Sequence, residues 1–169
     1  MDRLEGTSAL DGAADGMRRV VRAVPLGRGR DVLRGHGLGH PVHPLLVQVP
    51  IGAWLSAAVL DLLPDERRAA RTLIGVGLVA VAPAAISGWV DWAELDLPRR
   101  RVGLVHAAAN VTAVVLYAAS FAARRGDRDS GPGRALGFTG LLAVGFTGAL
   151  GGHLAHHRSP ATATTPDAA

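Results

Sequence analysis

Cysteine and lysine are absent from this chain of 169 residues, and charged residues make up only 19% of it. Without cysteine there is no disulfide, no thiolate-ligated zinc, no iron–sulfur cluster and no thiol nucleophile. Histidine is therefore the strongest ligand for a transition metal in this sequence. The arginines lie between apolar stretches rather than in one basic patch. This distribution argues against nucleic-acid binding and is typical of residues that flank membrane spans.

A cleavable secretory signal is also absent, because the first forty residues contain no continuous apolar segment. We expect these residues to remain in the mature protein. An apolar stripe opposes three arginines there: Leu10, Ala13, Met17, Val21 and Val24 against Arg18, Arg19 and Arg22. The pattern predicts a basic arm over residues 1–38, containing either an interfacial amphipathic helix or no fixed structure.

Four apolar stretches are each long enough to cross a membrane, since about twenty helical residues span the roughly 30 Å hydrocarbon layer. They cover residues 41–63, 70–92, 102–123 and 134–154. They are too long and too rich in alanine for membrane strands. Because the loops are short, we predict an all-α, up-down-up-down four-helix membrane bundle over residues 39–157. Residues 158–169 are rich in alanine, threonine and proline and predict a disordered tail.

Small residues in the fourth stretch predict one packing face, because helices in lipid associate by close backbone approach. This face contains Gly137, Leu141, Gly145, Gly148 and Gly152. At the end of the first stretch we expect Asp61 to pair with Arg67, Arg68 or Arg71.

The arginines next to the spans are evenly divided between the two sides of the membrane. Adding Arg18, Arg19 and Arg22 favours cytoplasmic N- and C-termini by the positive-inside rule.

The predicted topology gathers four histidines at one face of the membrane, because odd spans begin and even spans end on the side of the N-terminus. The residues that meet there are His40, His43, His106 and His153, with Asp91, Trp92 and Asn110 beside them. Ionisable groups within a membrane are costly and usually face the bundle interior. We therefore predict a binding site at this end of the bundle.

Four interpretations of this cluster are open. Imidazoles from two helices are suited to haem b, and His43, His106 and His153 with Asp91 are suited to zinc or copper. The cluster also fits a proton or quinone site, or a polar network without a ligand. His40 and His43 have the further interpretation of capping the first span. No catalytic motif occurs, so we expect a non-enzymatic protein.

Five motifs, in order, resemble the bacterial membrane family called domain of unknown function 2231: GHPVHP (39–44), PIGAW (50–54), SGWVDW (87–92), VHAAAN (105–110) and GGHL (151–154). The resemblance implies a four-helix bundle in the bacterial inner membrane, distantly similar to di-haem cytochromes b. It places the recurrent histidines at His40, His43, His106 and His153. It also ranks a haem b electron-transfer subunit ahead of the alternative, a non-redox scaffold or a zinc or copper protein.

Some relatives carry a Rieske-type domain after the fourth span. This chain has no cysteine there, so we expect any redox partner to be a separate protein.

Overall fold

The computed structural model describes residues 2–125 and 131–156, and its regular elements in these ranges are all helices. The apolar stretches lie in α4 (His43–Leu46) with α5 (Gln48–Leu60), in α6 (Arg67–Trp92), in α7 (Leu97–Ala123) and in α8 (Gly131–His156). All four are long and apolar enough to cross a membrane. The predicted all-α membrane fold is confirmed. The predicted disordered tail lies outside the described residues.

The helices differ from the predicted spans mainly at their starts. Helix α7 begins at Leu97 because the Asp96 side chain accepts a hydrogen bond from the Arg99 N–H (3.1 Å) and caps the first turn. The first span is divided at Val47, between α4 and α5. Pro50 explains the break, because it cannot donate to the Leu46 carbonyl and its ring crowds that carbonyl.

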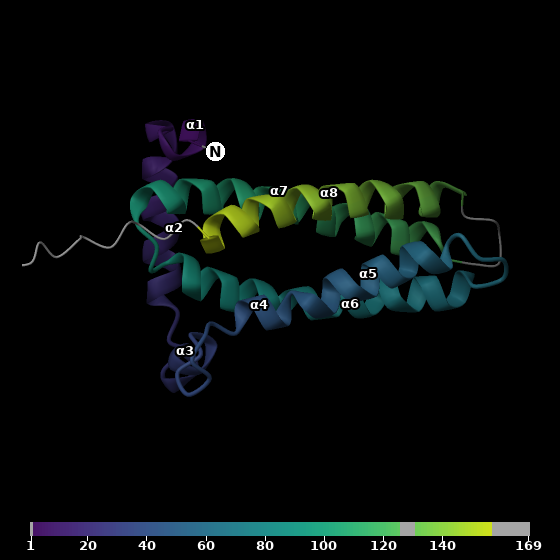
Figure 1. Ribbon diagram of the computed structural model, residues 1–169, viewed down its shortest axis with the longest axis horizontal. Helices are drawn as coiled ribbons and strands as arrows, with labels where there is room; N and C mark the ends of the chain where they lie inside the picture. The colour runs from purple at the N-terminus through teal and green to yellow at the C-terminus, as the bar shows by residue number, and fades with distance from the viewer. Residues whose placement is uncertain (1, 126–130, 157–169) are drawn as a thin grey trace, which may run out of the picture.

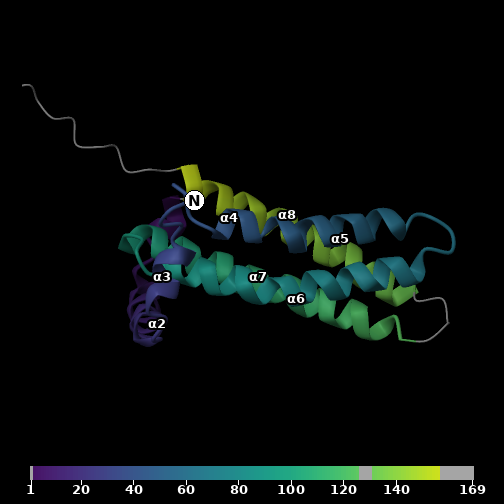
Figure 2. The ribbon, with the colours of Figure 1, turned by 90° about the horizontal axis from the view of Figure 1, so that it is seen from below.

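Consecutive long helices run antiparallel, since the start of one contacts the end of the next. Three contacts show this antiparallel arrangement: His43 with Ala84, Arg71 with Phe121, and His106 with Thr147. In Figures 1 and 2 the α5–α6 turn lies at one end of the bundle, and the α6–α7 turn lies at the other end beside α2 and α3. We call the end that carries α2 and α3 the histidine end.

The centre of the bundle is an aromatic stack between α5 and α7. The rings of Trp54 and Tyr117 lie 4.0 Å apart with an interplanar angle of 13°. The Trp54 indole N–H donates to the Ile74 carbonyl of α6 (3.3 Å). Because this polar group has a partner in the bundle, the large ring is buried without an unpaired donor.

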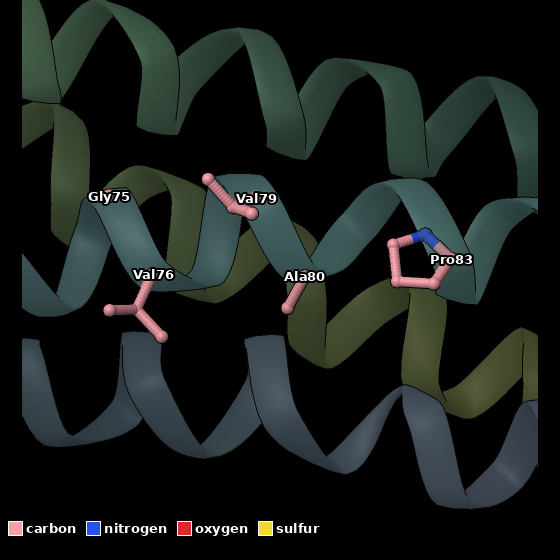
Figure 3. A pocket seen from close by; sticks show the side chains of 5 residues that line it. All are labelled: Gly75, Val76, Val79, Ala80 and Pro83. Atoms are coloured by element: carbon pink, nitrogen blue, oxygen red, sulfur yellow. The ribbon is translucent and has the colours of Figure 1, made fainter.

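Large apolar side chains cover the outside of the spans. Val79 is 77% exposed and Leu142 is 76% exposed, although both lie near the middle of their helices. A shallow apolar hollow lies on the outer side of α6 and is lined by Gly75, Val76, Val79, Ala80 and Pro83 (Figure 3). These surfaces match hydrocarbon better than water. The hollow contains no titratable side chain and is not the histidine site.

The N-terminal segment forms α1 (Asp2–Glu5), η1 (Ser8–Leu10), α2 (Asp11–Ala23) and α3 (Arg28–Leu33). Helix α2 lies across the histidine end of the bundle (Figure 1). Ala14 and Val21 pack in a cluster with Trp92, whereas Met17 and Val24 of the predicted stripe remain exposed. A position of α2 at the membrane surface stays a prediction.

Two salt bridges fasten α2 to the start of α7. Arg100 pairs with Asp15 (3.0 Å) and Arg101 pairs with Asp11 (2.6 Å). Arg100 is itself buried, so its charge is removed from water. The carboxylate of Asp15 compensates this loss of hydration.

The predicted packing face of α8 is wrong at Gly145 and Gly148, whereas Gly137 is buried as predicted. Gly145 and Gly148 are exposed, and a Cβ at either would meet nothing within 4 Å. The buried side of α8 instead contains Gly137, Gly140, Val144, Thr147 and Leu150. Both stripes repeat every three or four residues, so spacing alone could not select between them.

Candidate functional site at the histidine end

His43, the first residue of α4, is anchored to the neighbouring helix α6. Its Nδ1 lies 2.9 Å from the Ala84 carbonyl and 3.4 Å from the Ser87 hydroxyl. A carbonyl only accepts, so Nδ1 carries a proton, and the neutral ring presents a lone pair at Nε2. A Cβ at Gly88 would lie 2.8 Å from the imidazole Cε1. The glycine therefore allows the ring to lie directly against the α6 backbone.

His106 of α7 is anchored to α8 in the same way. Its Nδ1 lies 3.1 Å from the Thr147 carbonyl, and a Cβ at Gly151 would lie 3.2 Å from its Cε1. The Nε2 atom accepts a hydrogen bond from the Asn110 side-chain amide (2.9 Å). Both nitrogens of this imidazole therefore have partners, and the proton is again on Nδ1.

Several residues of the predicted set lie at the histidine end. His43 lies against α6 and His106 lies against α8. The half-buried Asp91 comes three residues after Gly88, the glycine that lies against the His43 ring. Asn110 contacts His106, as its place on the same face of α7 suggested.

The other predicted residues lie differently. His40 is exposed, and its Nδ1 lies 3.1 Å from the Pro41 carbonyl. Trp92 is buried under α2, and its indole N–H donates to the Arg100 carbonyl (3.0 Å). The side chain of His153 lies outside the described part of the structure, although its backbone belongs to α8. Its predicted role therefore stays a prediction.

The alternative in which His40 or His43 caps the first span is contradicted. The N-cap of α4 is Val42, and no side chain makes a capping hydrogen bond there. His43 crosses to α6 instead, because the Ala84 carbonyl lies within its reach.

Among the side chains that the structure describes, no group of three or more His, Cys, Asp or Glu is arranged to hold a metal ion. The predicted zinc or copper set includes His153 and is therefore not tested by this finding.

The opposite end of the bundle contains a buried ion pair formed by Asp61, and the predicted partner of this residue is wrong. Asp61 is paired with Arg124, not with Arg67, Arg68 or Arg71. Both Arg124 contacts to the Asp61 carboxylate measure 2.6 Å. Arg124 lies 63 residues further along the chain, so no local pattern pointed to it. Only the packing of α7 beside α5 makes it the neighbour.

An anchored imidazole pair at one end, a buried ion pair at the other and four apolar helices between them define a multi-pass membrane protein of the four-helix class. The chain belongs to the family of domain of unknown function 2231, described as a predicted membrane protein, whose family model matches residues 39–163. No curated protein matches the chain, and no solved structure does.

Proposed function

We propose that this protein is a membrane electron-transfer subunit that binds haem b at the histidine end of the bundle. The supporting observation is the way in which His43 and His106 are held. Each donates from Nδ1 to a main-chain carbonyl of the next helix, at 2.9 and 3.1 Å. This is the outer-shell arrangement typical of metal-ligating histidines, because it fixes the ring and raises the basicity of Nε2.

The donor set fits a haem iron, which neutral imidazole nitrogens would hold. Candidate ligands are His43 and His106, with His40 and His153 as further members of the predicted set. When bound, haem b would supply a one-electron carrier. The chain's own contribution is to orient the rings through Ala84 and Thr147 and to release the Nε2 of His106 from Asn110. Because the chain has no cysteine, a separate redox partner protein would deliver or accept the electron.

An optical spectrum tests this proposal. The protein is purified from cells that make haem, and spectra are recorded before and after dithionite reduction. We expect a Soret band and reduced α and β bands. His106→Ala should abolish or shift them, whereas His36→Ala, at an exposed position outside the spans, should leave them unchanged. A wild-type protein without these bands would overturn the proposal.

A second candidate, a non-redox membrane scaffold, is favoured by one contact. Asn110 already satisfies the Nε2 of His106 without any ligand. In this case the histidines form an interhelical polar network, and elemental analysis of the purified protein finds no stoichiometric iron, zinc or copper. Stoichiometric zinc or copper without haem would support the metal-binding alternative.

We propose that the protein lies in the bacterial inner membrane with both termini in the cytoplasm. The arginines of α2 support this orientation through the positive-inside rule.

A further inference from the structure

The second and fourth spans contain the same sequence pattern, displaced by 63 residues. Residues 71–81 read RTLIGVGLVAV and residues 134–144 read RALGFTGLLAV, so six of the eleven positions are identical without a gap. The shared positions are one arginine, one glycine and four apolar residues. A composition rich in alanine, glycine and valine explains single matches, but it does not explain the contacts that follow the same displacement.

The anchoring of the two imidazoles repeats with this displacement. His43 and His106 are each 41 residues before the carbonyl that they bind, in Ala84 and in Thr147. The glycine against each ring comes four residues after that carbonyl, as Gly88 and as Gly151.

The aromatic residues repeat in the same register. Trp54 lies against Gly77, and Tyr117 lies against Gly140. Each of these residues is 63 positions from its counterpart. The first helical hairpin, α4 to α6, and the second, α7 to α8, are therefore built alike.

Two pairs of counterparts also contact each other. Trp54 stacks on Tyr117, and Asp61 is bonded to Arg124. Under a two-fold rotation, a residue can touch its own counterpart only beside the rotation axis. The two contacts thus mark a pseudo-two-fold axis that runs along the bundle between the hairpins, which are visible as two helix pairs in Figure 1.

His43 and His106 are each 11 residues before Trp54 and Tyr117, about 16 Å along a helix. They are therefore placed at equal depth on opposite sides of the same axis. The remaining histidines have no such symmetry: the counterpart of His40 is Gly103, and the counterpart of His153 is Val90.

We infer that the bundle is a fused pair of like hairpins, and that the axis places His43 and His106 opposite each other as the two protein ligands of one metal centre. This inference rests on the proposed function for the identity of that centre. Zinc sites need three or four protein ligands, whereas a haem iron brings four nitrogens of its own and needs only two. Two imidazoles related by an axis are thus the donor set that haem b uses.

The ligand pair is tested in the full-length haem-loaded protein. We expect His43→Ala and His106→Ala each to remove the low-spin ferric signal in electron paramagnetic resonance, and to do so to the same extent. His36→Ala, at an exposed position outside the spans, should leave that signal unchanged. If His40→Ala or His153→Ala removes the signal while His43→Ala or His106→Ala keeps it, the pair is wrong and the proposed haem site remains.

A second measurement needs no haem and uses the cysteine-free background. The double variant His43→Cys with His106→Cys is treated with a bismaleimide, and the chain is then cut at a protease site inserted into the exposed turn at residues 62–66. We expect the two fragments to stay joined, and to separate when His40→Cys replaces His43→Cys. Separation of the His43→Cys and His106→Cys fragments would overturn the paired placement. Joined fragments in the double variant, together with a wild-type protein that takes up no added hemin, would confirm the pairing and overturn the proposed function.

Discussion

Arg124 donates two charge-assisted hydrogen bonds of 2.6 Å to the carboxylate of Asp61. Arg124 directly follows α7, and Asp61 directly follows α5. The pair is almost fully enclosed, with Asp61 7% and Arg124 6% exposed. Ser120 and the Gly133 carbonyl of α8 accept the remaining guanidinium hydrogen bonds at 3.1 Å. One side-chain network therefore ties three spans together at the end of the bundle opposite the histidines.

Replacing Arg124 by leucine should strongly destabilise the bundle, because the Asp61 carboxylate would be left buried without a partner. Loss of one member of a buried pair costs about 3–5 kcal/mol in the free energy of unfolding. The double variant Asp61→Leu with Arg124→Leu should recover much of this loss. Thermal unfolding in detergent measures the effect, with the exposed Arg125→Leu as control. Equal stability of Arg124→Leu and Arg125→Leu would contradict a structural role for the pair.

Adding a methyl group at Gly77 should disturb the central aromatic stack. A Cβ there would lie 2.2 Å from the Trp54 Nε1, so the ring must move away from α6 and lose its bond to Ile74. We expect Gly77→Ala to lower the free energy of unfolding by about 1–3 kcal/mol, as overpacking does. Gly52→Ala is the matched control, because a Cβ at that helical glycine meets nothing within 4 Å. A Gly77→Ala protein as stable as the control would show that Trp54 does not pack directly against Gly77.

Acid should release α2 from α7. The hydrogen bond from Arg101 holds the pKa of Asp11 below its ordinary value of 3.8. A lowered pKa in the docked state means that the contact is fully present above about pH 4 and is lost as the pH falls through the lowered value. The fluorescence of Trp92, which packs in the cluster with α2, reports the release.

Two variants separate this effect from general acid unfolding. Asp11→Asn should weaken the docking already at neutral pH and remove this group's contribution to the acid transition. Asp65→Asn, at an exposed turn on the opposite end of the bundle, should leave that transition unchanged. An identical acid transition in both variants would show that Asp11 does not control the docking.

Labelling from outside the cell decides the orientation. In the cysteine-free chain, Glu66→Cys lies in the α5–α6 region and Ser8→Cys lies near α2, at opposite ends of the bundle. With cytoplasmic termini, a membrane-impermeant maleimide should label Glu66→Cys in intact cells and Ser8→Cys only after permeabilisation. The reverse pattern would place the histidine end outside the cytoplasm.

Part of the histidine site followed from the sequence, because counting spans is enough to tell which span ends share a side. The span count thus predicts His43, His106 and Asp91 at one end, and the start of α4, the end of α6 and the first part of α7 lie toward that end. Their roles inside that end were not predictable. The placement of Trp92 beneath α2, and of the His43 ring against Gly88, depends on the rotation of each helix about its own axis.

The sequence by itself determined the class of fold. The length of each apolar stretch can be read directly from the sequence and compared with the thickness of a bilayer, and this comparison does not depend on which helices pack together. Tertiary structure alone decided which face of α8 is buried and which arginine meets Asp61. It also decided that Trp54 meets Tyr117. These are relations between segments far apart in the chain, fixed by the way whole helices pack against one another rather than by the order of residues within any one of them.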